Sequence, residues 1–567
     1  DPDLWEQDAD QMKQMGIRIV RMAEFAWSRL EPQEGKWDFN WLDRAVRLFT
    51  DRGMEVFLCT PTCTPPLWAF EKYPEITQRD VQGQPVAIGI RGHRCLNSPV
   101  FRRLAERMIR QMVTHYKDWE GVTGYQIDNE LEANHCRCAV CQTKFRQWIQ
   151  ERYKNVSEVN KAYGNSVWSG EYSDFSQVKP PMGELIRWQN PSLTLDYNRY
   201  ASDSTVDYVR FQEKLIRKID PTTKITTNNW LCEHMPDFYK LFETLDFVSY
   251  DNYPTTAIPK DEQELYSHAF HLDLMRGIKR KNFWIMEQLS GSVGSWMPMS
   301  QTPRPGMIKG YAMQAIAHGA DAVLHFRWRT AVSGAEMYWH GILGHDNVPG
   351  RRYREVHALC QTVNGWDALD GSVISNRVAL LYGSDQEYGF KLQHQAEEMY
   401  YLEQLKLLHD GFTSIGVGVD IVDEKQDLSA YDIVLAPNLL IDHPVVRQHL
   451  YQFVERGGCL VLTARCGVKD TYNKCIMEPL PTGYRELAGI TVKEYDPIGD
   501  RKQQLRLETT EWQQEWKSVQ TRWNQASSLP VCRQWCELLE PCEEEVRVLA
   551  RYDETFYRDT AAVTEHT

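Results

Sequence analysis

The sequence lacks the features that place a protein in a membrane or on nucleic acid. No apolar run approaches the roughly 18 residues that a membrane-spanning helix needs. The first residues form neither a basic segment nor an apolar segment of the kind that directs secretion. Acidic residues outnumber basic ones by 78 to 64, and the resulting net charge of −14 disfavours anionic partners. We therefore expect a cytoplasmic protein that binds neither nucleic acid nor a membrane.

The sequence lacks the dense cysteine framework of a small disulfide-rich domain. The 14 cysteines are scattered over 567 residues, so we expect most of them to be free thiols of a reducing compartment. One cluster differs, because it places three thiols within six residues: Cys136, Cys138 and Cys141. This short turn suits a tetrahedral metal ion with a fourth ligand from Cys95, His93 or His135. Reduced thiols without a metal are the alternative.

Low-complexity tracts and short repeats are also missing. The one regularity is an alternation of short apolar runs with amphipathic helices over residues 1–365. It predicts seven strands, at residues 17–22, 54–59, 124–127, 224–227, 246–250, 282–286 and 322–326. A (β/α)₈ TIM barrel has eight strands, and because the chain opens on a helix we expect the first to lie upstream of residue 1. A doubly wound open sheet would show the same alternation.

The pattern changes near residue 370, where a second and smaller domain is expected. Apolar runs at residues 378–382, 431–436 and 459–463 are typical of buried parallel strands. We assign residues 1–365 to a catalytic barrel and residues 366–567 to an α/β domain. Residues 497–530 are rich in polar side chains, and we expect an exposed excursion there.

Two predicted strands end on glutamate. Glu130 follows the apolar strand 124–127 and is preceded by Asn129, while Glu287 follows the strand 282–286. Residues at the carboxyl ends of barrel strands point into the active-site mouth, so both carboxyls would face one pocket. An Asn-Glu pair is equally suited to capping the next helix, and on the residues alone both interpretations stay open.

A pair of carboxyls in one pocket is the machinery of a glycosidase. In retaining enzymes the two groups stand about 5 Å apart and act as acid/base and nucleophile. In inverting enzymes they stand about 6.5–9.5 Å apart to admit a water molecule. Aromatic side chains that stack on sugar rings are available near the strand ends, although any single tryptophan is as easily a core residue.

Four stretches together resemble glycoside hydrolase family 42, the β-galactosidases. They are residues 21–32 (RMAEFAWSRLEP), 128–130 (DNE), 286–288 (MEQ) and 325–329 (HFRWR). The resemblance covers nearly the whole chain. It implies an eight-stranded barrel that releases terminal β-linked galactose with retention, with Glu130 as acid/base and Glu287 as nucleophile.

The same resemblance implies an assembly and a metal. It suggests a trimer and a second domain that resembles the glutamine-amidotransferase fold without its activity. It also suggests a small C-terminal β domain, which we expect this chain to lack because it ends at residue 567. Cys95 is the family's usual fourth ligand beside the cysteine cluster, so a structural Zn²⁺ is expected. We expect no organic cofactor.

Further residues take sugar-binding roles by resemblance to the family's motifs. They are Arg21, Asn129, Trp168, Trp296, Glu336 and His340. The spacings from Glu287 to Trp296 and from Glu336 to His340 are each one residue longer than in the family, and Glu336 and His340 could also be a surface pair. The expected partner is a β-galactoside or galacto-oligosaccharide. The alternatives are a β-glucosidase, an α-L-arabinopyranosidase, a xylanase-like enzyme or a non-catalytic sugar-binding protein.

Overall fold

The computed structural model describes residues 2–183, 188–254, 264–366, 369, 371–523 and 529–567. The chain forms two compact units. The first contains residues 1–149, 179–184 and 198–375, and the second contains residues 150–178, 185–197 and 376–567. None of the described helices has the length and apolar character to cross a bilayer.

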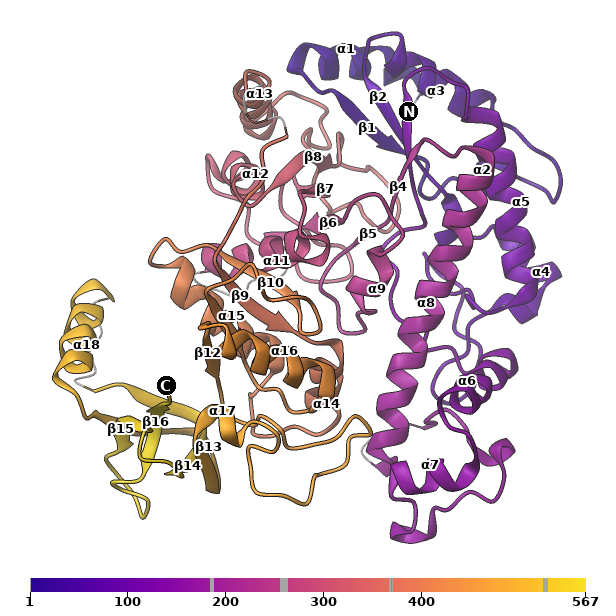
Figure 1. Cartoon of the computed structure of the whole chain (residues 1–567). Coiled ribbons are helices and arrows are strands. Elements are labelled where there is room, and N and C mark those ends of the chain that lie inside the picture. Colours follow the sequence, from indigo (N-terminus) through magenta and orange to yellow (C-terminus); the bar gives the residue numbers. More distant parts are fainter. Residues whose placement is uncertain (1, 184–187, 255–263, 367–368, 370, 524–528) are drawn as a thin grey trace. The chain divides into compact units, whose positions relative to one another are not determined.

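The first unit is built on parallel strands that run in chain order (Figure 1). Hydrogen bonds join them into two four-stranded sheets, the first of which contains β1 (Ile19–Met22), β2 (Glu55–Cys59), β3 (Val122–Gln126) and β4 (Lys224–Thr226). The second sheet contains β5 (Asn228–Asn229), β6 (Ser249–Asn252), β7 (Phe283–Leu289) and β8 (Ala320–Phe326). Only Thr227 separates β4 from β5, so the two continue one strand. The seven strands predicted from the sequence are therefore confirmed.

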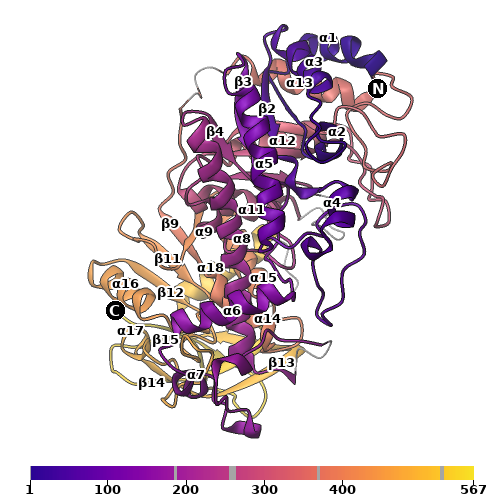
Figure 2. The same cartoon turned by 90° about the vertical axis from the view of Figure 1, so that its right-hand side faces the viewer.

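Helices alternate with these strands, as the barrel requires. The N-terminal pair, α1 and α3, lies side by side in both views (Figures 1 and 2). The larger helices of this part of the chain are α1 (Trp5–Met15), α3 (Asn40–Thr50), α5 (Pro99–Tyr116), α6 (Ala139–Arg152), α8 (Pro191–Ile219), α11 (Glu264–Lys279), α12 (Met307–Ala317) and α13 (Arg351–Val363). The shorter ones are α2 (Trp27–Leu30), α4 (Leu67–Lys72) and α9 (Phe238–Phe242).

Aromatic side chains fill the barrel interior. Phe57 of β2 is fully buried and packs against Phe247 and Trp284, with ring centroids 6.1 and 5.6 Å away. Its ring occupies the space beside Gly124 of β3, where an added Cβ would stand 1.8 Å from a ring carbon. Glycine at position 124 thus lets a large ring close the interior, which is a packed core and not a pore.

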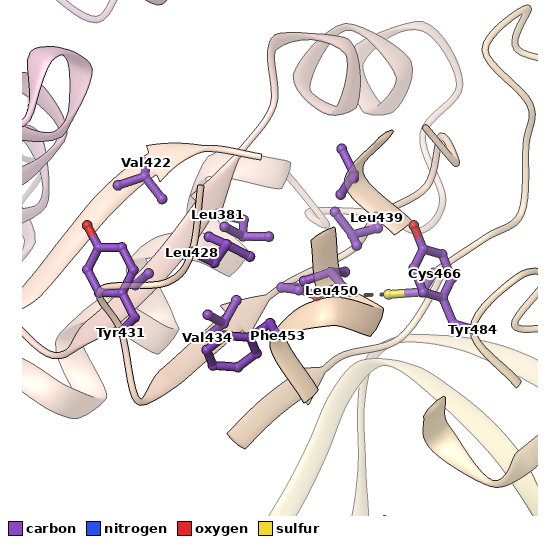
Figure 3. Packing of buried hydrophobic residues seen from close by; sticks show 13 residues of the cluster. Leu381, Val422, Leu428, Tyr431, Val434, Leu439, Leu450, Phe453, Cys466 and Tyr484 are labelled. Atoms are coloured by element: carbon purple, nitrogen blue, oxygen red, sulfur yellow. Dashed lines mark hydrogen bonds between the residues drawn. The ribbon is translucent and has the colours of Figure 1, made fainter. Parts of the chain in front are cut away.

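The second unit contains a parallel sheet with the order β10-β9-β11-β12. Its strands are β9 (Val378–Tyr382), β10 (Val419–Asp423), β11 (Ile433–Ala436) and β12 (Cys459–Leu462). Helices of this unit are α7 (Val156–Tyr163), α14 (Ser384–Leu392), α15 (Tyr401–Thr413), α16 (Pro444–Glu455), α17 (Arg485–Ala488) and α18 (Thr510–Trp523). Leu381, Val434, Leu450 and Phe453 meet in the core beside this sheet (Figure 3). The parallel α/β architecture expected for this part is confirmed, although β10 was not predicted.

A small closed β barrel follows the parallel sheet. It has the order β13-β14-β16-β15, formed by β13 (Ile490–Leu507), β14 (Val531–Pro541), β15 (Arg547–Tyr552) and β16 (Ala561–Glu565). The expected excursion over residues 497–530 was therefore wrong for residues 497–507, which belong to β13. Register shifts between Val492 and Glu494 and again near Gly499 break the two-residue alternation that would have revealed the strand.

The core of the second unit yields a stability prediction. Leu450 on α16 is fully buried, and its truncation in Leu450→Ala should cost about 2–5 kcal/mol through lost burial and a residual cavity. Native-state hydrogen exchange of the β9 and β11 amides would report this loss, since the two units need not unfold together. Val445→Ala on the same helix is the control, because Val445 is 52% exposed and should change little. Equal effects of the two substitutions would contradict the described packing.

Candidate active site

The carboxyl ends of β3, β6 and β7 bring three acids together. Glu287 lies within β7, Asp251 lies within β6, and Glu130 follows β3. One carboxyl oxygen from each of the three residues lies within 4.8 Å of the others. Glu287 and Asp251 are 5% and 1% exposed, and the Glu130 side chain is 10% exposed. The two glutamates predicted from the sequence therefore do share one site.

The turn after β3 is held in an unusual backbone conformation. Asp128 and Glu130 have φ angles of 55° and 45°, in the left-handed region that most residues avoid. The buried Asp128 carboxylate anchors the turn, because it receives hydrogen bonds of 2.6 Å from both Arg94 and Thr62. Such local strain persists only where the surroundings fix it, and it is common at active sites.

Glu287 is surrounded by hydrogen-bond donors. Arg21 Nη2 lies 2.6 Å from Glu287 Oε1, and the Tyr253 hydroxyl donates to Oε2 over 2.6 Å. Burial opposes the charge of Arg21, but Glu287, Glu24 and further acidic neighbours together outweigh it, so the pKa of Arg21 stands well above its ordinary value. The guanidinium is charged and compensates a negative charge on Glu287.

Glu130 has a different environment. Arg91 Nη2 lies 2.6 Å from Glu130 Oε2, and Asn129 Nδ2 donates to the same oxygen over 3.3 Å. Burial raises the pKa of Glu130 above the usual value; Glu287 adds to the rise and Arg91 opposes it. A raised pKa favours the protonated form of Glu130, which a general acid requires.

Asn228 connects the cluster through its side-chain amide. Its Nδ2 donates to Asn129 Oδ1 over 3.0 Å and to Asp251 Oδ2 over 2.7 Å. Its Oδ1 accepts from the backbone amide of Glu130 over 3.2 Å. Asn228, Asp251, Tyr253 and Arg91 are further residues of this site that the sequence pattern did not single out. The first three stand at the ends of predicted strands, the position that singled out Asn129 and Glu130.

Aromatic rings extend from the cluster toward solvent. Tyr253 meets the edge of Trp339, with ring centroids 5.1 Å apart and planes at 84°. Trp296 stacks on Trp339 at 5.4 Å with planes at 26°, and it is 52% exposed. Trp296 is thus linked by ring contacts to the tyrosine that binds Glu287. An exposed ring in this position offers a face for an apolar surface such as that of a sugar.

The structure does not join the other three predicted sugar ligands to the carboxyls. Glu336 forms an ion pair with Arg327, and His340 lies 3.0 Å through Nδ1 from the Ser292 carbonyl. Across the described ranges, no hydrogen bond or ring contact links Glu336 or His340 to Glu130 or Glu287. Trp168 belongs to the second compact unit, where it is 88% exposed and has a φ of 64°.

Four cysteines form a second candidate site in the first unit. The sulfurs of Cys95, Cys136, Cys138 and Cys141 all lie within 4.8 Å of one another, and Cys95 Sγ stands 3.6 Å from Cys138 Sγ and 3.4 Å from Cys141 Sγ. Four sulfurs about 2.3 Å from a tetrahedral ion would stand about 3.8 Å apart, so the spacing fits a metal.

The surroundings of the four sulfurs also suit metal-bound thiolates. The Arg79 amide donates to Cys136 Sγ over 3.3 Å, and Asn97 Nδ2 donates to Cys141 Sγ over 3.4 Å. The rival ligands lie outside the group: His93 Nε2 accepts from the Gly89 amide, and His135 packs against the His234 ring. The structure therefore favours Cys95 as the fourth member of a cysteine-rich metal site.

Sequence comparisons identify relatives over the whole chain. The family model described as β-galactosidase of glycoside hydrolase family 42 matches residues 1–366, and a β-galactosidase trimerisation domain matches residues 376–567. β-Galactosidase BgaA of Clostridium cellulovorans is 51% identical over 565 residues, which cover 100% of this chain and 83% of that protein. β-Galactosidase BgaH of Haloferax lucentense is 37% identical over 88% of this chain and 76% of that protein.

Solved structures of β-galactosidases are also similar to this chain. The β-galactosidase of the Antarctic haloarchaeon Halorubrum lacusprofundi has a TM-score of 0.91 and 32% identity, covering 99% of this chain and 83% of that one. The cold-adapted β-galactosidase of Rahnella sp. R3 has a TM-score of 0.93 and 28% identity, covering 100% of this chain and 82% of that one. The expected TIM barrel with a smaller second domain is confirmed. The chain belongs to glycoside hydrolase family 42.

Proposed function

We propose that the protein is a retaining β-galactosidase that releases terminal non-reducing β-D-galactose from β-galactosides. The observation that carries this proposal is the pair Glu130 and Glu287, with carboxyl oxygens within 4.8 Å of each other. A spacing of that order fits the roughly 5 Å of retaining enzymes better than the roughly 6.5–9.5 Å of inverting enzymes, which hold a water molecule between the carboxyls. Membership of a family whose curated relatives are named β-galactosidases supports galactose over the glucoside, arabinoside and xyloside alternatives.

The two glutamates take different roles because their partners differ. Glu287, compensated by Arg21 and hydrogen-bonded by Tyr253, attacks the anomeric carbon as a carboxylate. Glu130 donates its proton to the departing oxygen as the glycosidic bond breaks, which leaves a galactosyl ester on Glu287. Glu130 then takes a proton from water, the water oxygen attacks the anomeric carbon, and the ester bond to Glu287 breaks. Two inversions return the original configuration.

The same electrostatics allow Glu130 to change roles. While Glu287 is ionised, its charge helps to raise the pKa of Glu130 and keeps the acid protonated. Esterification removes that charge, whereas Arg91 remains at 2.6 Å. The pKa of Glu130 therefore falls in the intermediate, and the group becomes the base that the second step needs.

We propose the remaining predicted residues as sugar ligands. Arg21 donates a hydrogen bond to Glu287, Asn129 donates one to Glu130, and Arg21 also donates to Asn129. Trp296 supplies an exposed ring near Tyr253. Glu336 and His340 follow β8, the strand next to β7, and carry polar atoms suited to galactose hydroxyls. Trp168 is assigned from family resemblance alone.

We propose a structural zinc ion at Cys95, Cys136, Cys138 and Cys141. Four thiolates complete a tetrahedral shell and leave no position for a substrate, so the ion would supply cross-linking and no chemistry. It would join the segment before α5 to the segment between Glu130 and α6. The ion would therefore support the loop that carries Glu130.

We further propose that the protein works as a homotrimer. The match of residues 376–567 to a trimerisation domain supports an assembly through the second part of the chain. It also supports our division into a catalytic part, residues 1–365, and a trimerisation part, residues 366–567. None of the cysteines forms a disulfide in the described part of the chain, which supports our proposal of a reducing compartment such as the cytoplasm.

A panel of nitrophenyl glycosides tests the substrate. We expect the β-D-galactopyranoside to show a kcat/KM at least about tenfold above the β-D-glucopyranoside, α-L-arabinopyranoside and β-D-xylopyranoside, because hydrogen-bonding sites reject a misplaced or missing hydroxyl strongly. A preference for one of the other glycosides would contradict the proposed specificity for galactose. If none of the four glycosides were hydrolysed, the proposed function would be refuted.

Azide distinguishes the two glutamates by product configuration. In Glu287→Ala, azide should enter where the nucleophile is missing and yield α-galactosyl azide. In Glu130→Ala, an activated aryl galactoside should still form the ester, and azide should then yield β-galactosyl azide. Glu132→Ala is the control, since its exposed side chain lies two residues beyond Glu130 and should be dispensable. Proton NMR of the products identifies the anomer that each variant forms. The opposite anomers would exchange the roles assigned to Glu130 and Glu287.

Metal analysis tests the zinc site. Protein prepared without chelator should hold one zinc per chain, and Cys138→Ser should lose most of it together with thermal stability. Activity should decline later, as the Glu130 segment loosens. Cys360→Ser is the matched control, because Cys360 is a half-buried free thiol on α13 and should leave the zinc content unchanged. A wild-type protein without metal would favour the free-thiol interpretation.

A further inference from the structure

The third carboxyl of the active site has no role in the two-glutamate mechanism. Asp251 on β6 stands directly opposite Glu287 on the neighbouring strand β7. Its carboxyl oxygen lies within 4.8 Å of those of Glu130 and Glu287, and the residue is 1% exposed. Three acids thus meet in a largely buried space.

The two arginines of the cluster are committed to the glutamates. Arg21 Nη2 lies 2.6 Å from Glu287, and Arg91 Nη2 lies 2.6 Å from Glu130. Asp251 receives one neutral donor, Asn228 Nδ2, over 2.7 Å at Oδ2. In the described part of the chain, Oδ1 has no hydrogen-bond partner and no cation pairs with Asp251. The charge of Arg21 opposes the rise in the pKa of Asp251, but an ionised Asp251 would still face two acids with no ion pair of its own among the described residues.

Groups from the surrounding strands do not change this balance. Burial raises the pKa of the Cys59 thiol and of the Tyr250 and Tyr253 hydroxyls, so all three are neutral. Burial also raises the pKa of Asp251 well above its ordinary value, and the charges of Glu287 and Glu130 add to the rise. The titratable and charged groups around Asp251 are then Arg21 of β1 with its partner Glu24, Cys59 of β2, Arg91, Glu130 after β3, Tyr250 of β6, Tyr253 after β6, and Glu287 of β7.

We propose that Asp251 is a positioning residue that is protonated in the resting enzyme and titrates together with the protonated Glu130, so that Glu287 alone carries the negative charge. The inference rests on the proposed glycosidase function. Asp251 does not touch the reacting atoms in this scheme. It keeps Glu130 protonated toward alkaline pH, because whichever of the two acids ionises first opposes ionisation of the other.

The coupled ionisation of Asp251 and Glu130 determines how hydrolysis depends on pH. Glycosylation requires the proton on Glu130, so the alkaline limb of kcat/KM reports its loss. In the wild-type protein the coupled acids Asp251 and Glu130 lose two protons as the pH rises. After the first proton has left, part of the population still carries the remaining proton on Glu130. Without the Asp251 carboxyl, a single ionisation remains. The limb should then be steeper and lie at lower pH.

The experiment compares Asp251→Asn, Asp251→Ala and the wild-type protein on methyl β-D-galactopyranoside, whose poor leaving group needs a proton. We expect the alkaline limb to shift down by about one pH unit in both variants. Ser249→Ala is the matched control: this buried residue lies on the same strand and donates to the Thr227 carbonyl over 2.7 Å. It should leave the limb in place. A merely structural Asp251 would lower kcat at all pH values without a shift, and that result would overturn the proposal.

A second measurement does not depend on hydrolysis. The infrared difference spectrum between wild-type protein and Asp251→Ala at pH 7 should contain the band of a protonated carboxyl that is present in the wild-type protein and absent from the variant. Absence of that band would show an ionised Asp251 and overturn the inference. If the band is present but the wild-type protein hydrolyses no β-galactoside, the proton is confirmed and the proposed function fails instead.

Discussion

Repulsion among carboxyls confined within 4.8 Å is the constraint on which the rest of the active site depends. Like charges this close in a buried space cannot all persist, so each must be neutralised by a cation or keep its proton. The structure does both. Arg21 compensates Glu287 and Arg91 contacts Glu130, while burial favours the protonated form of the acid that has to donate. The difference between nucleophile and acid therefore lies in the neighbours, since the two side chains are chemically identical.

The barrel makes this arrangement possible. Parallel strands end at one rim, so the acids at the ends of β3, β6 and β7 converge although Glu130 lies more than a hundred residues before the other two in the chain. The Phe57 ring beside Gly124 closes the interior below. The left-handed turn at Asp128 and Glu130, anchored by Arg94 and Thr62, then fixes the acid against the nucleophile.

The parts that follow simple periodicity could be predicted from the sequence. The seven barrel strands and the positions of Glu130 and Glu287 at strand ends needed only the apolar runs and the polar residues after them. Asp251, Asn228 and Tyr253 obey the same rule, but polar residues at strand ends are common, and only distances reveal which ones meet. Arg91 lies in a loop, where no periodicity exists. Strand β13 was missed because its bulges and charges conceal the alternation.

The cysteine cluster and the acid are mechanically connected. Cys95 lies next to Arg94 and four residues after Arg91, so the segment that carries both arginines ends at the cluster. The segment that leaves Glu130 reaches the same cluster at Cys136. A metal ion bound to the four sulfurs, as proposed, would therefore fix both partners of the Glu130–Arg91 ion pair, together with the Arg94–Asp128 pair that shapes the turn. Because a shift of about 1 Å in a catalytic group is enough to slow a reaction severely, a cross-link without chemistry of its own can still determine how well the acid works.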